Sequence, residues 1–242
     1  AVVLLLSLNI SLFNAQNTFL EDNSYDALFV KWNNTLDENN HALALSCPKI
    51  DTVRIAVIGL GNRGQSALGR LPNIPGVKIV AIADIDSNKV NDIHDKYFKN
   101  YQYKKPAKYY GKEDWKVICQ RDDIDLIYVC THWELHSPIA IYAMKNDKHV
   151  AVEVPAAMTV KDCWKLVKTA EKTRKHCIQL ENCMYDFFEI TVLNMSQNNL
   201  FGDLVHAEGA YIHDLRALNF SNTYYWNHWR LKSLQKTNGN TY

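Results

Sequence analysis

The fold is decided by Val53-Arg-Ile-Ala-Val-Ile-Gly-Leu-Gly-Asn-Arg-Gly64, where an apolar, strand-like run passes directly into a Gly-x-Gly-x-x-Gly pattern and then into helical sequence. In such a turn the first glycine permits a tight bend, the second lets the backbone approach a pyrophosphate, and the third allows close strand–helix packing. The N-terminus of the helix adds partial positive charge. The stretch therefore predicts a dinucleotide-binding turn in which Gly59, Gly61 and Gly64 hold the phosphates.

Asp84 ends the next apolar run, Val77–Ala83, and follows Gly59 at close to the roughly 20 residues expected for a ribose-binding acid. Such a carboxylate accepts hydrogen bonds from the adenosine ribose hydroxyls and repels a phosphate there, so Asp84 favours NAD over NADP. Asp86 is the second candidate for this role. A glycine turn in an ordinary α/β domain is the alternative that these residues leave open.

Strand-like and helical segments alternate from Val53 onward, as in βαβ units. The strand-like segments are rich in Val and Ile without clean alternation, which is typical of strands buried on both faces. They predict an α/β fold, a Rossmann-type doubly wound parallel sheet. Thr159 and Asp162 form a capping box that should begin a helix, with Val160, Trp164, Val167 and Ala170 on one face and Trp164 in the core. The strands are expected over residues 53–58, 77–83, 125–130, 148–153 and 177–181.

The sequence changes in character after residue 183. A helix-like stretch, Tyr185–Gln197, leads into Asp203–His213, whose alternation indicates a strand with one exposed face. We expect the start of an incomplete α+β substrate domain here. The predicted domains are therefore an NAD-binding Rossmann domain over residues 51–183 and a partial C-terminal substrate domain over residues 184–242.

The N-terminal residues 1–13 form an apolar run that is too short to span a bilayer but suits a signal peptide. We interpret residues 1–15 as a signal-peptide remnant and the polar residues 16–50 as a linker, which predicts an exported protein, periplasmic or secreted. A buried N-terminal helix is the alternative. Neither a methionine nor a basic region precedes the run, and the last domain is small, so the chain is expected to be truncated at both ends.

Composition limits the classes of function. Of the 242 residues, 47% are hydrophobic and 22% are charged, as in ordinary globular proteins. A formal net charge of +1 offers no broad attraction for nucleic acid, which we exclude as a partner. The six cysteines show no C-x-x-C spacing, so we expect buried thiols rather than a disulfide framework or a metal site.

Polar and aromatic residues stand at three strand ends, where open α/β sheets bind their ligands. Trp133 and His136 follow strand 125–130, Glu153 ends the next strand, and Asn182 follows the last. We interpret His136, Glu153 and Asn182 as site residues, since a polar residue beside a buried strand needs a partner. For Trp133, packing at a helix start and contact with a cofactor are equal alternatives.

The chain also contains several long and unusual sequence motifs. They are Gly59-Leu-Gly-Asn-Arg-Gly-Gln65, Trp133-Glu-Leu-His136, Val152-Glu-Val-Pro-Ala-Ala-Met158, Glu181-Asn182, His206-Ala-Glu-Gly-Ala-Tyr-Ile-His-Asp-Leu-Arg216 and Tyr225-Trp-Asn-His-Trp-Arg230. Together they resemble glycoside hydrolase family 109. That family looks like an offshoot of the Gfo/Idh/MocA oxidoreductases and contains NAD-dependent α-N-acetylgalactosaminidases. The resemblance runs from Val53 to the last residue.

The resemblance implies roles for individual residues. On the sugar side, Tyr211 and Arg230 would contact the substrate. Tyr242 stands where the family has a Tyr-Pro-Thr-His motif that contacts both substrate and cofactor. Of that motif only the tyrosine is present in this chain. Candidates for proton transfer are Tyr211, His213 and His228, although a structural role for each histidine stays open. The residues that would hold NAD are Asn62, Arg63, Asp84, Trp133, His136, Glu153, Val154 and Asn182.

The mechanism implied by the resemblance is a glycosidase reaction without the usual carboxylate pair. The hydroxyl at carbon three is oxidised, the proton at carbon two is lost, the aglycone is eliminated, water adds, and the hydride returns. Dehydrogenases of the parent superfamily usually carry Glu-Lys-Pro where this chain has Glu153-Val154-Pro155, which disfavours a lysine-assisted dehydrogenase.

The expected partner is a small-molecule glycoside or a glycan bearing terminal α-N-acetylgalactosamine, with homo-oligomerisation left open and no membrane span. Two other functions remain as alternatives: an NAD-dependent sugar dehydrogenase of the Gfo/Idh/MocA type, and a non-catalytic nucleotide-binding remnant. The chain as given is expected to be inactive and poorly soluble, because its last domain is too short for a complete sheet domain.

Overall fold

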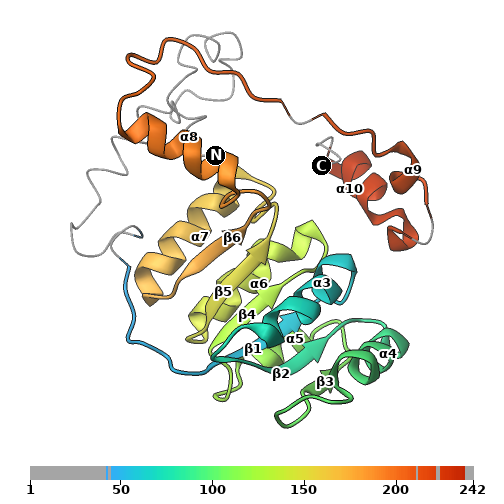
Figure 1. Ribbon diagram of the computed structural model, residues 1–242. Coiled ribbons are helices and arrows are strands. Elements are labelled where there is room, and N and C mark those ends of the chain that lie inside the picture. Colours follow the sequence, from blue (N-terminus) through green and yellow to red (C-terminus); the bar gives the residue numbers. More distant parts are fainter. Residues whose placement is uncertain (1–41, 43–44, 211, 222–223, 238–242) are drawn as a thin grey trace. The chain divides into compact units, whose positions relative to one another are not determined.

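The computed structural model describes Ala42 and residues 45–210, 212–221 and 224–237 (Figure 1). Six strands, all parallel, form one sheet in the order β3-β2-β1-β4-β5-β6. This is the order of the doubly wound dinucleotide-binding folds, so the predicted sheet is confirmed. The strands are β1 (Val53–Ile58), β2 (Val77–Ala83), β3 (Ala107–Tyr109), β4 (Leu126–Val129), β5 (His149–Glu153) and β6 (Cys177–Leu180).

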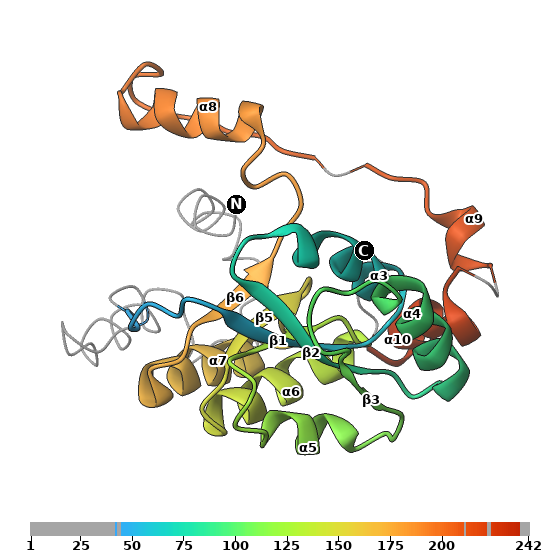
Figure 2. The same ribbon diagram turned by 60° about the horizontal axis from the view of Figure 1, so that its bottom comes forward.

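Helices cover both faces of the sheet, as Figure 2 shows. On one face lie α3 (Asn62–Arg70) and α4 (Ser87–Phe98), with the short 3-10 helix η3 (Leu71–Asn73) after α3. On the other face lie α5 (Asp114–Cys119), α6 (Trp133–Lys145) and α7 (Val160–Thr173). Because each connection between parallel strands crosses over a face, the two helical layers leave the four central strands β2, β1, β4 and β5 mostly buried.

The core has two halves, one on each face of the sheet. In the first half, Ile127 and Val129 of β4 pack with Ile139 of α6. In the second, Val57 of β1 packs with Leu68 of α3. All five side chains are 0 or 1% exposed, and the burial of each such side chain contributes about 1.5–3 kcal/mol. Burial on both faces is the physical reason for the unbroken apolar runs in the sequence.

All five strands predicted from the sequence are present, with ends that differ by at most one residue. The capping box is present as well: the Thr159 hydroxyl accepts a hydrogen bond from the Asp162 amide at 3.1 Å and donates one to the Asp162 carboxylate at 2.8 Å. The predicted buried face of this helix is only partly correct. Of the predicted face, Ala170 is buried, Trp164 and Val167 are half-buried, and Val160, at the first helical position, is 68% exposed. The other buried residue of α7 is Leu166.

The described residues divide into two compact units, one up to Cys183 and one from Met184 onward. The second unit contains α8 (Phe187–Gln197), α9 (Arg216–Asn219), the 3-10 helix η4 (Trp226–His228) and α10 (Trp229–Thr237). The helix predicted over residues 185–197 is therefore confirmed as α8.

The strand predicted over residues 203–213 is wrong for the part of that range that the structure describes, residues 203–210, 212 and 213. These residues are extended and exposed, and none of the described strands pairs with them. A strand is stable only where its backbone groups find partners in a ladder. Alternating side chains alone therefore did not suffice to form one.

Several predictions fall on residues outside the described range. These are the signal-like residues 1–15, most of the linker over residues 16–50, and two site candidates, Tyr211 and Tyr242. None of the described helices is long and apolar enough to cross a bilayer.

The cysteines are only partly buried, contrary to expectation. Cys119 is buried, while Cys47, Cys163 and Cys183 are exposed. Burial raises the pKa of the Cys119 thiol to about 12, so this thiol stays protonated at neutral pH. Among the described residues, His, Cys, Asp and Glu nowhere gather in a group that could hold a metal ion.

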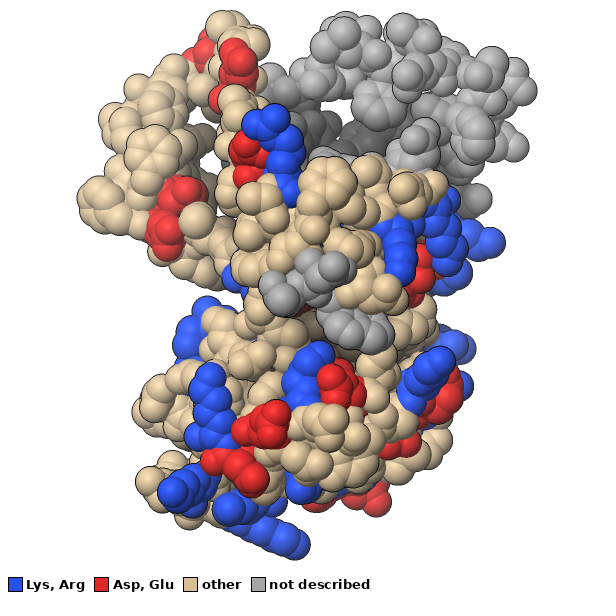
Figure 3. All heavy atoms as spheres, turned by 90° about the vertical axis from the view of Figure 1, so that its right-hand side faces the viewer, with Lys and Arg blue, Asp and Glu red and all other residues tan. Residues whose placement is uncertain are grey.

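Charges of both signs are mixed on the surface. On the face drawn in Figure 3, Lys and Arg side chains lie beside Asp and Glu side chains. Opposite charges also form ion pairs, such as Arg121 with Asp123 at 2.6 Å. This mixture agrees with a formal net charge of +1.

Candidate functional site

The parallel sheet gathers the predicted cofactor residues at one edge. The carboxyl ends of parallel strands meet at the same edge of a sheet. The Gly59–Gly64 turn follows β1, Asp84 follows β2, and Trp133 begins the helix after β4. Glu153 is the last residue of β5, and Asn182 comes shortly after β6. The strand order therefore brings together segments that are far apart in the sequence.

The glycine turn has the close approaches that the pattern requires. Gly59 has a φ of +94°, and a Cβ atom there would lie 2.4 Å from the Cys130 carbonyl oxygen. A Cβ atom at Gly64 would lie 2.0 Å from the Gly59 carbonyl oxygen. Around Gly61, by contrast, a Cβ atom would meet nothing within 4 Å. The absence of a side chain at Gly59 and Gly64 thus lets strand, turn and helix pack closely. At Gly61 there is free space where a side chain would stand, so a ligand can approach the backbone there.

The N-terminus of α3 suits a phosphate group. Gly61 is the N-cap, no side chain caps the helix in the described structure, and its first turn contains no acidic residue. The first amides of a helix have no partner within the helix, and the helix dipole adds partial positive charge beside them. A pyrophosphate satisfies both requirements. The residues present therefore fit a dinucleotide, with the amides of Asn62, Arg63 and Gly64 as donors.

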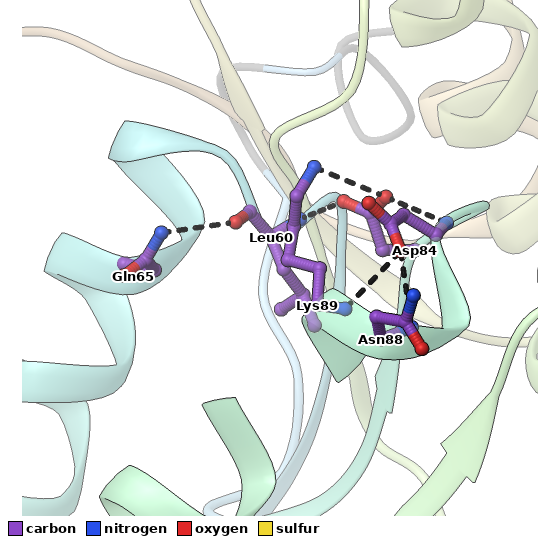
Figure 4. A network of polar contacts seen from close by, with 6 residues as sticks. Leu60, Gln65, Asp84, Asn88 and Lys89 are labelled. Carbon is purple, nitrogen blue, oxygen red and sulfur yellow. Dashed lines mark hydrogen bonds and ion pairs between the residues drawn. The ribbon is translucent and has the colours of Figure 1, made fainter. Parts of the chain in front are cut away.

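Asp84, the residue after β2, also fixes the glycine turn (Figure 4). Its Oδ2 atom accepts a hydrogen bond from the Leu60 amide at 2.8 Å, and its Oδ1 atom accepts one from the Asp86 amide at 3.1 Å. The Lys89 ammonium lies 3.5 Å from Oδ1. Asp86, the second candidate acid, instead caps α4 by accepting hydrogen bonds from the Asn88 and Lys89 amides. Asp84 is therefore the better placed of the two for a ribose.

Arg63, Glu153 and Asn182 form a second polar group at this edge. An Arg63 Nη1 atom donates a hydrogen bond to the Asn182 side-chain oxygen at 3.3 Å. Glu153 is 9% exposed, and its burial raises the pKa of its carboxyl group, whereas the positive charges of Arg63 and Arg70 oppose this. Val154, the next residue, is half-buried. Arg63 of α3 thus acts both on Glu153 of β5 and on Asn182, which follows β6.

His136 lies inside the protein rather than on the open edge. It is 1% exposed, with Nδ1 at 2.8 Å from the Pro155 carbonyl oxygen and Nε2 at 2.9 Å from the Thr131 carbonyl oxygen. Burial lowers the pKa of His136, and the two carbonyl groups oppose this. A neutral imidazole has one N–H donor, so only the protonated ring can donate to both oxygens. With a proton on Nδ1 the ring donates to the Pro155 carbonyl group and so ties the segment after β4 to the segment after β5.

Trp133 stands in the first turn of α6 and is 5% exposed. This burial agrees with packing at a helix start and does not decide against contact with a cofactor. The cofactor contacts of Trp133 and His136 stay predictions.

The sugar-side candidates belong to the unit from Met184 onward. His213 is exposed, and His228 Nδ1 lies 3.5 Å from the Asn219 carbonyl oxygen. The Arg230 guanidinium lies 4.4 Å from the centre of the Tyr225 ring, close enough for a cation–π interaction. Tyr211 and Tyr242 lie outside the described residues. The grouping of these residues around a sugar stays a prediction.

Sequence reasoning missed two cations near the predicted acids: Lys89 beside Asp84 and Arg70 near Glu153. A signal for Lys89 was available. Asp86 is a good N-cap residue, which places Lys89 in the first turn of the helix that follows Asp84. The orientation of Arg70 depends on how α3 packs on the sheet, which the local sequence does not give.

Comparison with known proteins agrees with this geometry. Residues 53–180 match the model of the oxidoreductase family with the NAD-binding Rossmann fold, and residues 185–242 match the C-terminal domain of glycosyl hydrolase 109. The chain is 50% identical over 203 residues to a glycosyl hydrolase family 109 protein of Porphyromonas gingivalis, covering 84% of this chain and 42% of the relative. It is 50% identical over 206 residues to an α-N-acetylgalactosaminidase of Bacteroides fragilis, covering 84% and 48%. The chain thus spans less than half the length of these relatives.

Solved structures share the fold at low sequence identity. One is the WlbA dehydrogenase of Chromobacterium violaceum in complex with NADH and UDP-GlcNAcA, with a TM-score of 0.55 and 21% identity over 65% of this chain and 44% of that one. Another is a myo-inositol 2-dehydrogenase of Lactobacillus plantarum, with a TM-score of 0.55 and 23% identity over 64% and 43%. From its sequence and its sheet, the chain belongs to the oxidoreductase family with the NAD-binding Rossmann fold, and within it to the glycosyl hydrolase family 109 proteins.

Proposed function

We propose that this chain supplies the nucleotide-binding part of a glycosidase that removes terminal α-N-acetylgalactosamine with the help of NAD. The observation that carries this proposal is the 50% identity to the α-N-acetylgalactosaminidase of Bacteroides fragilis. The glycine turn with open space at Gly61 supports the cofactor part of the proposal. The WlbA dehydrogenase, whose sheet is similar, was solved with NADH.

Bound NAD would supply reversible hydride transfer to and from the sugar. The chain's own residues would bind and orient it. The amides at the start of α3 hold the pyrophosphate, and Asp84 accepts hydrogen bonds from the ribose hydroxyls. Arg63 and Asn182, joined by a hydrogen bond, line the edge beside Glu153. Val154 cannot take up or release a proton, so a base must come from another residue.

On the sugar side we propose Tyr211, His213 and His228 for proton transfer, because histidine titrates near neutral pH and a positioned tyrosine can act as an acid or a base. Arg230, Tyr211 and Tyr242 are proposed to contact the N-acetylgalactosamine. The substrate is then a glycoside or glycan that ends in this sugar. Export of the protein follows as a proposal from the apolar residues 1–13.

A dehydrogenase acting on a free sugar is the second candidate, because several solved structures with a similar sheet are dehydrogenases. The two functions differ in their redox balance. The glycosidase returns its hydride in each turnover and accumulates no NADH, whereas a dehydrogenase forms one NADH for each sugar that it oxidises.

The test uses a chimera, because the chain spans less than half the length of its relatives. Residues 53–242 of this chain replace the matching segment of the Bacteroides fragilis enzyme, which itself serves as the control. We expect the chimera to hydrolyse an aryl α-N-acetylgalactosaminide in heavy water, with deuterium at carbon two of the released sugar and no accumulation of NADH. Unlabelled sugar from active, NAD-free protein would refute the redox mechanism, and NADH formation from free sugar would favour the dehydrogenase.

A further inference from the structure

Lys89 is placed to act on the charge of Asp84. It stands in the first turn of α4, and its ammonium lies 3.5 Å from Asp84 Oδ1 (Figure 4). The Asp84 side chain is 9% exposed, whereas that of Lys89 is 32% exposed. The carboxylate is therefore held within the fold, and the ammonium beside it keeps contact with solvent.

Asp84 has little freedom to move away from Lys89. Its Oδ2 atom is held by the Leu60 amide at 2.8 Å, and its Oδ1 atom by the Asp86 amide at 3.1 Å. Asp86 uses its own carboxylate to cap α4 and so fixes the turn of helix that carries Lys89. The position of the Asp84 carboxylate and that of the Lys89 backbone are thus both set by backbone hydrogen bonds.

His132 is another titratable group close to this pair. Burial lowers the pKa of His132; the negative charge of Asp84 raises it, and the positive charge of Lys89 lowers it. Since burial is the largest of these influences, His132 is neutral at physiological pH and adds no charge. The pair of Asp84 and Lys89 then carries one negative and one positive charge, and the carboxylate of Glu134 is the other negative charge that acts on His132.

This balance matters for the choice between NAD and NADP. A lone carboxylate at the end of the second strand repels the 2′-phosphate of NADP, and a nearby cation can accommodate that phosphate. Hydrogen bonds from the ribose hydroxyls of NAD go to the carboxylate itself and depend little on a neighbouring charge. A cation at this position therefore acts on NADP more strongly than on NAD.

We propose that Lys89 is a specificity-determining residue that lets the Asp84 site admit the 2′-phosphate of NADP, so that the chain binds both dinucleotides. The proposal rests on the proposed function only in requiring a dinucleotide at the Gly59–Gly64 turn. Asp84 makes the affinity for NAD higher than that for NADP, and Lys89 reduces this difference in affinity.

The experiment is a titration of NAD and of NADP, followed by calorimetry, into the chimera in which residues 53–242 of this chain replace the matching segment of the Bacteroides fragilis enzyme; the chimera with the unchanged sequence of this chain is the wild type. Lys89→Gln should weaken NADP binding about tenfold, the effect of losing one attraction of about 1.4 kcal/mol, and leave NAD binding within about twofold of the wild type. Lys89→Arg should retain NADP binding. The matched control is Lys96→Gln on the same helix, whose ammonium lies 5.0 Å from the centre of the Tyr97 ring; it should change neither affinity.

The outcomes separate this inference from the cofactor proposal. A wild-type chain that binds NAD but not NADP overturns the inference alone, as does a Lys89→Gln variant that weakens both dinucleotides equally or neither. A wild-type chain that binds neither dinucleotide overturns the proposed NAD dependence and the inference with it. If Lys89→Gln fails to fold, Lys89→Arg still decides, because loss of NADP binding in that folded variant overturns the proposal.

Discussion

The two units of this chain differ in where they keep their apolar side chains. In the unit that ends at Cys183, Val57 and Ile127 are fully buried between the sheet and its helices. In the unit from Met184 onward, Phe187 and Ile212 are 87% and 93% exposed, and the buried residues of its described part include the polar Asn219. The first unit is held by long-range packing, and the described contacts of the second are mostly local. A mutation should therefore have very different consequences in the two.

The largest contrast is expected for glycines. Gly64→Ala would place a Cβ atom 2.0 Å from a backbone oxygen, which cannot be relieved by a side-chain rotation, and we expect a loss of about 4 kcal/mol or more in the free energy of unfolding. Gly209→Ala, where a Cβ atom meets nothing within 4 Å, should change it by less than about 0.5 kcal/mol. Urea unfolding followed by circular dichroism measures both. Equal stability of the two variants would contradict the close approach at Gly64.

A smaller contrast is expected for isoleucines. Ile127→Ala removes a fully buried side chain of β4 and should cost about 3 kcal/mol, from lost burial and from the cavity left behind. Ile212→Ala removes a side chain that is 93% exposed and should cost less than about 0.5 kcal/mol. Thermal unfolding of both variants gives the comparison. A marked loss with Ile212→Ala would show that this side chain is packed in solution.

Acid should weaken the first unit through Asp125. This carboxylate accepts hydrogen bonds from the Arg54 amide and guanidinium, at 2.8 and 2.6 Å among others, and these contacts lower its pKa. Because the folded pKa is lower than the unfolded one, the contribution is complete above pH 3.8 and is lost as pH falls through the folded value. Asp125→Asn should cost about 1.5 kcal/mol at pH 7.

The same variant provides the check on the sign. Its stability relative to the wild type should recover as pH falls, since the wild type loses its ionised carboxylate while the amide does not titrate. Unfolding curves from pH 7 down to about pH 2 measure this, because the change is expected below the unfolded pKa of 3.8. A difference between the two proteins that stays constant over this range would rule out the Arg54 contact as its cause.

The smallest contrast is expected for helix caps. Thr159→Ala removes a cap that accepts a hydrogen bond from the Asp162 amide, and it should cost about 1 kcal/mol. Asp186 begins α8 without a side-chain cap hydrogen bond, so Asp186→Ala should cost less than about 0.5 kcal/mol. Denaturant midpoints at equal slope measure both values. A larger effect for Asp186 would mean that α8 is capped in solution.

The sequence predicted the first unit well because its signals are local. Gly59, Gly64 and Asp84 each mark a strand end or a turn with a residue type that the local geometry requires. The strand β3 was missed for the opposite reason: it has three residues, two of which, Ala107 and Lys108, are exposed at the edge of the sheet. So short and polar a strand has no hydrophobic pattern to detect.

The site was predicted as a set of residues but not as a set of contacts. His136 was expected at the open edge, yet its ring lies between the carbonyl groups of Thr131 and Pro155, which come from two different connections. The pairing of Lys89 with Asp84 likewise depends on how α4 follows β2 in space. For Asp203–His213 the alternation was correct as a pattern, but a strand also needs a neighbour, and a pattern within one segment cannot supply it.

The hydrogen bond from the Leu60 amide to Asp84 also limits how this protein can evolve. An acid that only bound a ribose could be replaced whenever selection favoured another cofactor. Here the same carboxylate satisfies a backbone donor in the glycine turn, so its loss leaves that donor without its partner and weakens the turn for every cofactor. Descendants that replace Asp84 must therefore acquire a second change that restores an acceptor for the Leu60 amide, and the two substitutions should be inherited together.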